Sequence, residues 1–251
     1  LKEKRTSLIN HVVTKGLDSN VEMKDSGVEW IGEIPRGWVN SKIKFLSQII
    51  SKGTTPSTVG GNILDKGPIY YIKMSDFGQN NVNIPSNYID SDTNELLKRS
   101  SLQEYDILFV ITGEIGRTVI VNKEVIPSNI NQNISFIRLK KKENVKFTWY
   151  WLSSNILKTQ LKTLYNVSTL PSLSMEDLGN LHIPQPPIKE QQKIVEYLDK
   201  QTEEIETLIQ LEQKKIDTLK EYRQSLISEV VTGKVRVCEE DYSENLESQT
   251  V

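Results

Sequence analysis

Hydrophobic residues follow two different periodicities along this chain, and the change between them falls near residue 188. Before that point, short apolar runs bounded by turn residues predict strands at 69–72, 107–111, 118–121 and 134–139. Apolar residues at helical spacing predict a helix over 147–164, and Ser174 followed by Asp177 predicts a capped helical turn. The fold class predicted is therefore α+β, with one mixed, strand-containing globular domain over residues 39–187.

From residue 188 onward the pattern predicts one long helix that extends to about residue 234. Residues 188–231 contain neither glycine nor proline, while Pro186 and Pro187 precede them and Gly233 follows. Such a helix is roughly 65 Å long, which exceeds the diameter of about 35–40 Å expected of the preceding domain. Apolar residues recur every seven positions with polar interruptions, which favours a coiled coil over a buried core helix. The predicted interface residues are Leu198, Ile205, Leu208, Ile209, Ile216, Leu219 and Leu226.

The two ends of the chain repeat each other. Residues 1–17 read LKEKRTSLINHVVTKGL and residues 219–235 read LKEYRQSLISEVVTGKV, with ten of 17 positions identical at an offset of 218 residues. The repeat predicts a duplicated parent whose unit is a globular domain followed by a long helix. Residues 1–38 are then the end of a preceding helix and a connecting segment. The chain is then expected to be one unit of that parent.

Composition narrows the possible functions. The chain has 251 residues, 37% of them hydrophobic and 25% charged, which is enough apolar material for a packed core. The lone Cys238 excludes an internal disulfide, and two histidines make a metal centre improbable. No phosphate-binding, dinucleotide-binding or nucleophile motif is present, so no residue is predicted to be catalytic or to bind a metal or cofactor. No apolar run is long enough to span a membrane, and a cytoplasmic location is expected.

The net charge of −2 conceals a segregation, because the middle of the chain carries the basic excess while the helix and the tail, residues 235–251, are acidic. The middle also contains five polar loops, at 52–57, 73–76, 112–117, 129–133 and 166–169. Lysine and arginine can grip phosphate or guanine, amides can pair with adenine, and carboxylates can accept from cytosine. Each loop also has a purely structural explanation as a turn. The candidate DNA-binding residues are Lys52, Thr54, Thr55, Lys73, Ser75, Asp76, Thr112, Arg117, Asn131, Gln132, Asn133 and Thr169.

Several segments resemble the DNA-specificity subunits of type I restriction-modification systems. The first is GLDSNVEMKDSGVEWIGEIPRGW at 16–38, and the second is LHIPQPPIKEQQKIVEYLDKQTEEIETLIQ at 181–210, followed by LKEYRQSLISEVVTG at 219–233. DILFVITG at 106–113 and QNISFI at 132–137 are similar to motifs of the family's target-recognition domains. The resemblance covers most of the chain.

That resemblance implies a non-catalytic recognition subunit. In the family, two target-recognition domains each read one half of a bipartite site in double-stranded DNA, and two long helices form an antiparallel coiled coil. The helices dock modification (methyltransferase) subunits, and restriction subunits join through the complex. S-adenosylmethionine, ATP and Mg²⁺ are implied for those partner subunits and not for this chain. The resemblance implies that this chain is either the second half of such a two-domain subunit or a natural half-sized subunit. A half-sized subunit could self-associate through its long helix.

Two alternatives remain open at this stage. The chain could be the specificity region of a fused restriction-methyltransferase enzyme, in which case catalytic motifs would lie elsewhere on the same polypeptide. It could also be a coiled-coil assembly module without DNA readout, which the low net charge favours.

Overall fold

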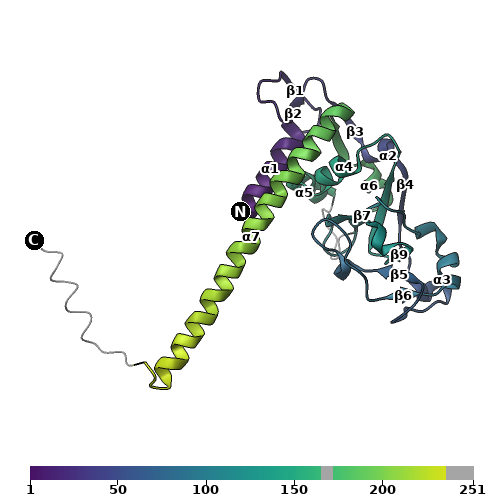
Figure 1. The fold of residues 1–251 in the computed structure, drawn as a ribbon. Coiled ribbons are helices and arrows are strands. Elements are labelled where there is room, and N and C mark those ends of the chain that lie inside the picture. Colours follow the sequence, from purple (N-terminus) through teal and green to yellow (C-terminus); the bar gives the residue numbers. More distant parts are fainter. Residues whose placement is uncertain (165–171, 236–251) are drawn as a thin grey trace, which may run out of the picture. The chain divides into compact units, whose positions relative to one another are not determined.

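A computed structural model describes residues 1–164 and 172–235 of the chain (Figure 1). Its contacts group Glu3–Lys200 into one compact unit, and the long helix from Gln201 onward belongs to another, together with Leu1–Lys2. The compact unit thus starts well before residue 39, which is the predicted first residue of the globular domain. The helices are α1 (Lys2–Lys15), α2 (Ile43–Leu46), α3 (Ser91–Leu96), α4 (Val145–Leu152), α5 (Asn155–Leu164), α6 (Met175–Asn180) and α7 (Ile188–Val231). Short 3-10 turns are η1 (Pro56–Val59), η2 (Met74–Asp76), η3 (Lys98–Ser100) and η4 (Lys123–Val125).

The centre of the compact unit is a four-stranded antiparallel sheet in the order β4-β10-β7-β8. Its members are β4 (Ser47–Lys52), β10 (Ile134–Leu139), β7 (Ile107–Val110) and β8 (Thr118–Ile120). Successive side chains of a strand point to opposite faces, so Ile107 and Phe109 enter one core while Leu108 and Val110 enter the other. Burial on both faces explains why these strands read as unbroken apolar runs in the sequence.

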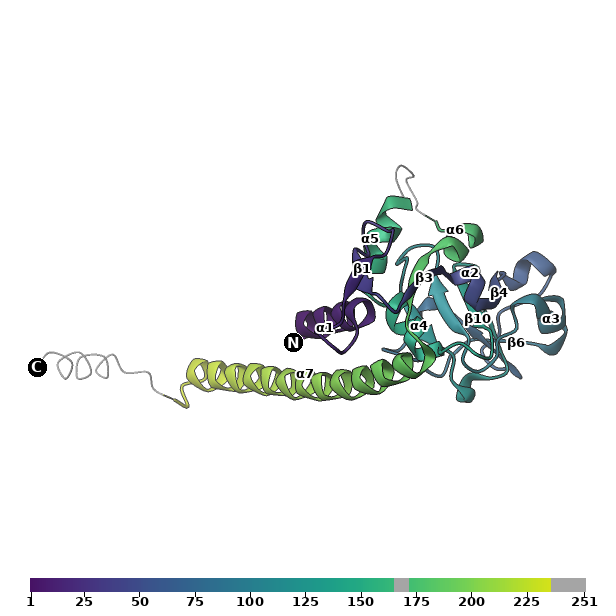
Figure 2. The same cartoon turned by 90° about the horizontal axis from the view of Figure 1, so that it is seen from above.

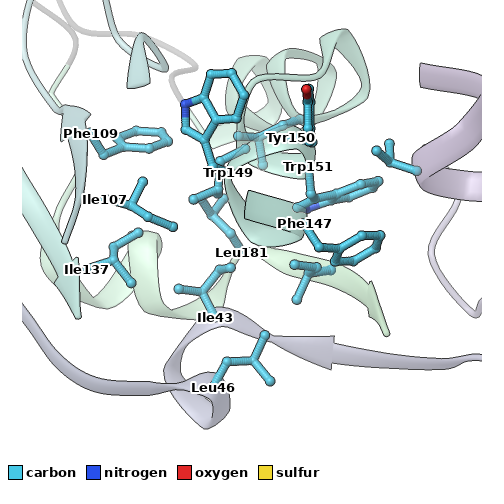
Figure 3. Packing of buried hydrophobic residues seen from close by; sticks show 14 of the residues in the cluster. Ile43, Leu46, Ile107, Phe109, Ile137, Phe147, Trp149, Tyr150, Trp151 and Leu181 are labelled. Carbon is cyan, nitrogen blue, oxygen red and sulfur yellow. The ribbon is translucent and has the colours of Figure 1, made fainter. Parts of the chain in front are cut away.

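One face of this sheet packs against helices, and Figure 3 shows the aromatic side chains that fill the space. Trp149, Tyr150 and Trp151 of α4 are all buried, and the indole N–H of Trp149 donates to the carbonyl oxygen of Thr118. Figure 2 shows α6 beside α2 on this side of the domain. The core reading of these three consecutive aromatic residues, as opposed to a platform for stacking bases, agrees with their burial.

The other face packs against a smaller sheet in the order β6-β5-β9. Strand β5 (Ile69–Ile72) pairs antiparallel with β6 (Tyr88–Ile89) and parallel with β9 (Ser128–Ile130). Parallel strands require a long crossover connection, and here the chain between β5 and β9 passes through α3, β7 and β8. A further pair, β3–β11 (Val39–Lys42, His182–Gln185), joins the two ends of the domain, and β1 (Met23–Asp25) pairs locally with β2 (Glu33–Pro35) before it.

The helix predicted over 147–164 is wrong in one respect, because the structure divides it into α4 and α5 at Ser153 and Ser154. The Ser153 hydroxyl bonds back to the carbonyl oxygen of Trp149, and the Ser154 hydroxyl accepts from the backbone N–H of Leu157. Serine offers the backbone such alternatives to helical hydrogen bonds. The strands predicted at 69–72 and 134–139 are confirmed to the residue, and the capping box of Ser174 and Asp177 is present.

A buried ion pair fastens the start of β7 to β10. Arg138 donates from Nε and Nη2 to the two carboxylate oxygens of Asp106, at 2.8 and 2.7 Å, and Nη2 also donates to the carbonyl oxygen of Ser101. The Asp106 side chain is 1% exposed. Burial raises the pKa of the Asp106 carboxyl, while Arg138 and the backbone N–H of Gln103 act against the rise. The bidentate geometry is what keeps a buried carboxylate tolerable there.

Asp106→Asn should destabilise the domain by about 3 kcal/mol, because it leaves the Arg138 guanidinium without its counter-charge in a largely buried place. Urea unfolding followed by circular dichroism measures this free energy. Glu95→Gln is the matched control, since it breaks the exposed Lys98–Glu95 pair, whose loss should cost less than about 1 kcal/mol. Equal effects of the two substitutions would contradict the structural role given to Asp106.

Candidate nucleic-acid interface

Four of the five polar loops singled out in the sequence lie within the described residues, and they lie at one end of the two stacked sheets. Strand β4 ends at Lys52, which pairs with Ser135 near the beginning of β10, and Ile134 of β10 pairs with Val110 at the end of β7. In the smaller sheet the parallel strands β5 and β9 end together, at the pair Ile72 and Ile130. Loops 52–57, 73–76, 112–117 and 131–133 therefore leave the sheets at the same end. Every candidate DNA-binding residue belongs to them except Thr169, which lies outside the described residues.

Loop 52–57 crosses directly over loop 131–133 at Gly53. The backbone N–H of Gly53 donates to the carbonyl oxygen of Ile134 at 3.0 Å. A Cβ atom added to Gly53 would lie 2.1 Å from the carbonyl oxygen of Ile130 and 2.3 Å from that of Asn131. Only glycine permits so close an approach of two backbones. The crossing holds Thr54 and Thr55 beside Asn131 and Gln132.

A buried tyrosine, Tyr71, is hydrogen-bonded to both loops of this crossing. The Tyr71 hydroxyl of β5 donates to the carbonyl oxygen of Thr54 at 3.2 Å and is hydrogen-bonded to the Asn131 side chain. Burial raises the pKa of Tyr71 to about 12, against the effect of Asn131, so the phenol stays neutral and can donate at ordinary pH. The side chain of Tyr71 is fully buried. It is a positioning residue that sequence reasoning missed, because it lies inside an apolar run that reads only as a strand.

Asn131 serves the loop itself. Its side-chain oxygen accepts from the backbone N–H of Asn133 at 3.0 Å, and its own backbone N–H donates to the carbonyl oxygen of Ile72. Asn129, part of the same predicted loop, is instead the middle residue of β9 and fully buried. Its amide bonds to the Ser100 hydroxyl and to the carbonyl oxygen of Leu97. The reading loop proper therefore begins at residue 131.

Loop 73–76 is closed on itself in a similar way. The Asp76 carboxylate accepts from the backbone N–H of Lys73 at 2.7 Å, forming a capping box around η2. The Ser75 hydroxyl also points to Asp76, at 3.4 Å. One oxygen of Asp76 is thus engaged in fixing the turn, while Lys73 is half-buried and Ser75 is exposed.

Arg117 connects two of the loops. Its Nη2 donates to the carbonyl oxygen of Phe77 at 2.9 Å, its guanidinium carbon lies 5.6 Å from the centre of the Phe77 ring, and its Nη1 pairs with Glu114 at 3.3 Å. The turn that carries it, between β7 and β8, uses Gly113 and Gly116 at positive φ, which glycine adopts readily. Arg117 therefore acts at least as a positioning residue, a role that the sequence prediction of a phosphate or guanine contact did not include. Thr112, at the start of this turn, forms an isolated bridge with Ser172.

Among the candidate residues in these loops, Lys52, Ser75, Arg117, Gln132 and Asn133 are exposed, while Thr54 and Thr55 are partly exposed. They offer a cation, hydroxyls and amides in one place. This is the set of groups with which proteins contact phosphates and base edges. Among residues 1–164 and 172–235, no cluster of three or more His, Cys, Asp or Glu side chains is placed to hold a metal ion.

The predicted coiled-coil residues fall into two environments. Leu198 belongs to the core of the compact unit, and Ile205 is 6% exposed. Further along α7 the predicted residues are open, with exposures between 42% and 65% for Leu208, Ile216, Leu219 and Leu226. None of the helices in the described part of the chain has the length and apolar character needed to cross a membrane.

The two copies of the repeat also differ in environment. In α1, Ile9, Val12 and Val13 are 7%, 3% and 0% exposed and belong to the main core. Their counterparts near the end of α7, Ile227, Val230 and Val231, are 46%, 37% and 80% exposed. The same apolar face is thus buried at the first copy and uncovered at the second.

Known proteins show the same sequence pattern. A specificity subunit of the type I restriction enzyme MjaVIII from Methanocaldococcus jannaschii is 26% identical to 94% of this chain, which covers 55% of that relative. The EcoBI specificity subunit from Escherichia coli is 30% identical over 52% of this chain and 28% of its own length. A second M. jannaschii protein, the putative MjaX specificity subunit, is 26% identical over 94% of this chain and 52% of its own length. The chain therefore spans about half the length of the M. jannaschii relatives.

Solved structures share the fold. A chain from work on complex assembly and conformational transition of the type I R-M system superposes with a TM-score of 0.68 at 19% identity, over 91% of this chain and 52% of that one. The HsdS subunit from Thermoanaerobacter tengcongensis superposes with a TM-score of 0.58 at 19% identity, over 84% of this chain and 45% of that one.

The model of the type I restriction modification DNA specificity domain matches residues 35–221, which is most of the chain. The curated relatives are named specificity subunits, in agreement with the prediction of a non-catalytic chain. With the mixed sheet domain and the long helix in place, the chain belongs to the family of type I restriction-modification DNA specificity domains.

Proposed function

We propose that this chain reads one half of a bipartite site in double-stranded DNA for a type I restriction-modification complex. The observation that carries the proposal is the convergence of four polar loops at one end of the stacked sheets. The residue types of these loops suit base readout. The loops come from distant parts of the sequence. Loops held on a rigid scaffold are where binding residues concentrate. The major groove is the natural target, because all four base pairs can be distinguished there.

Charge supports the same assignment. Lys52, Lys73 and Arg117 place cations beside the hydroxyl and amide groups at the loop end, where Asp76 and Glu114 supply two carboxylates. Cations that contact phosphates hold a protein in register on the duplex, and the neutral polar groups distinguish bases. The modest basic excess of the domain predicts weak binding by this chain alone, strengthened when a partner also grips the DNA.

The second part of the proposed function is assembly of the complex, and it rests on the helices. The uncovered apolar face of α7 is a docking surface for a helix, and modification subunits are the partners proposed to bind the helical part. In such a complex S-adenosylmethionine, ATP and Mg²⁺ would belong to the modification and restriction subunits.

The internal repeat suggests what covers the end of α7. Ile227, Val230 and Val231 repeat the residues of α1 that this domain buries in its own core. The surface that fits them is therefore one like the α1 site of this domain, on a second copy in which the end of α7 takes the place of α1. Two copies joined in this way would present two loop clusters, as a bipartite site requires.

The deciding experiment is a selection from random duplex DNA, with the chain co-purified with the modification subunit of its own host at a stated salt concentration. We expect enrichment of a motif of about three to five base pairs per loop cluster. Co-purification without any enriched motif would instead favour an assembly module without DNA readout.

Lys52→Ala should weaken binding to all sequences alike and lower the slope of log affinity against log salt by about one, as expected for one lost phosphate contact. Binding titrations at several salt concentrations measure both quantities. Lys98→Ala is the control, because Lys98 lies in η3, which is near Ser128, the first residue of β9. Loop 131–133 follows Ile130, the last residue of β9, and so leaves the strand at its other end. An unchanged salt slope for Lys52→Ala would remove Lys52 from the interface.

Val231→Asp should abolish self-association of the chain without lowering its melting temperature, because the side chain is 80% exposed in the single chain. Sedimentation velocity at micromolar concentrations measures the association. Glu229→Lys is the matched control, since its counterpart His11 is exposed in the first copy of the repeat. A wild-type chain that stays monomeric, or a Val231→Asp chain that associates normally, would contradict this mode of docking.

A further inference from the structure

Among the amide side chains of loop 131–133, Gln132 is the one whose environment both exposes it and fixes its orientation. Asn131 is engaged on both sides, by the backbone N–H of Asn133 and by the Tyr71 hydroxyl. Gln132 lies at the exposed tip, and its side-chain oxygen Oε1 is 2.7 Å from the hydroxyl oxygen of Thr55. The partner comes from a loop that is 77 positions away in the sequence.

The bond between Thr55 and Gln132 determines which way the amide points. A carboxamide oxygen can only accept, so the Thr55 hydroxyl is the donor. A separation of 2.7 Å is the usual length of an O–H···O bond and is shorter than most N–H···O bonds. The oxygen of the Gln132 amide is thereby turned to Thr55, and the amide nitrogen is turned away from it.

Thr55 is itself held in place. Its carbonyl oxygen accepts from the backbone N–H of Thr58 at 3.0 Å and from the Thr58 hydroxyl at 2.7 Å. The preceding residue, Thr54, is anchored by the Tyr71 hydroxyl, and Gly53 is locked against the backbone of Asn131. A reading residue held by a rigid neighbour loses little conformational entropy when it binds.

An amide held in this way still has one oxygen lone pair and two N–H donors. Adenine presents the complementary pair in the major groove, with N7 as acceptor and the N6 amino group as donor. Resting on the function proposed above, we propose that Gln132 reads the adenine of one A·T base pair and that Thr55 is the residue that positions its amide.

The test is the same selection, repeated with variants in the complete chain bound to its modification subunit. Gln132→Leu should lose adenine preference at one position by about ten-fold or more and leave the other positions unchanged. Thr55→Val should reduce the preference at that same position by a smaller factor, because the amide is then free to turn over. Thr55→Ser, which restores a hydroxyl donor, should recover the wild-type preference.

Replacement of that adenine by 7-deazaadenine isolates the contact, because it removes only the N7 acceptor. Wild-type protein should bind the modified duplex more weakly, whereas Gln132→Leu should bind both duplexes equally. Thr207→Val serves as the matched control, since its exposed hydroxyl bonds only within α7, to the carbonyl oxygen of Glu203, and lies outside the loops. We expect it to leave the base preferences unchanged.

The possible results separate the two proposals. If wild-type protein enriches no motif, the proposed function itself fails. If the motif is intact but Gln132→Leu changes no position, affects every position alike, or affects a base pair other than A·T, the assignment of Gln132 is wrong while the function stands. If Thr207→Val reproduces the effect of Thr55→Val, the positioning role of Thr55 is wrong.

Discussion

The double burial of β7 and β10 is the constraint on which the rest of this structure depends. Both strands lie inside a four-stranded sheet whose two faces are covered, by helices on one side and by the smaller sheet on the other. No polar group can be presented from either face without a large desolvation cost. Variable polar chemistry is therefore confined to the ends of the strands, where side chains reach solvent without disturbing the core. At one of these ends the parallel pair β5 and β9 adds its own loops, which concentrates four polar segments in one place.

That arrangement separates stability from recognition. Some polar side chains form their hydrogen bonds inside the domain, where unsatisfied donors and acceptors would be costly. These are Tyr71, Asn129 and the Asp106–Arg138 pair. Side chains such as Gln132 and Lys52 lie outside and contribute little to the core. On the proposed function, substitution among the latter would change the bases that are read without lowering the stability of the scaffold. A recognition module gains from this division, because a base contact is only selective when its geometry is fixed by something that does not move.

The sequence predicts the strands well where burial dictates the pattern. Residues 69–72 and 134–139 carry buried apolar side chains on both faces, and their predicted bounds agree with the structure. The helix over 147–164 was harder to predict, because the hydroxyls of Ser153 and Ser154 interrupt it through local bonds that periodicity does not report. The residue types of the loops were readable, but not their partners. The bond between Thr55 and Gln132 leaves no signal in a single sequence, since it joins loops that are 77 positions apart. The bond of Asn131 to the backbone of Asn133 is local, and it is of the kind that the explanation of these loops as turns allowed.

The repeated helix segment demonstrates that one sequence can satisfy two roles. In α1 the Val-Val pair at 12–13 is buried and completes the core, while the same pair at 230–231 is open to solvent. A face that contributes burial energy in the first setting exposes apolar surface in the second, and an exposed apolar stripe on a helix is unfavourable until another surface covers it. Because the residues are identical, a surface that covers the end of α7 should have the same chemistry and spacing as the surface that buries α1. The spacing between two DNA half-sites would then follow from the length of α7, because its 44 residues rise by 1.5 Å each and admit little compression. Recognition loops can diverge freely under this arrangement, whereas the apolar positions of α1 and of the end of α7 must remain matched to a common surface.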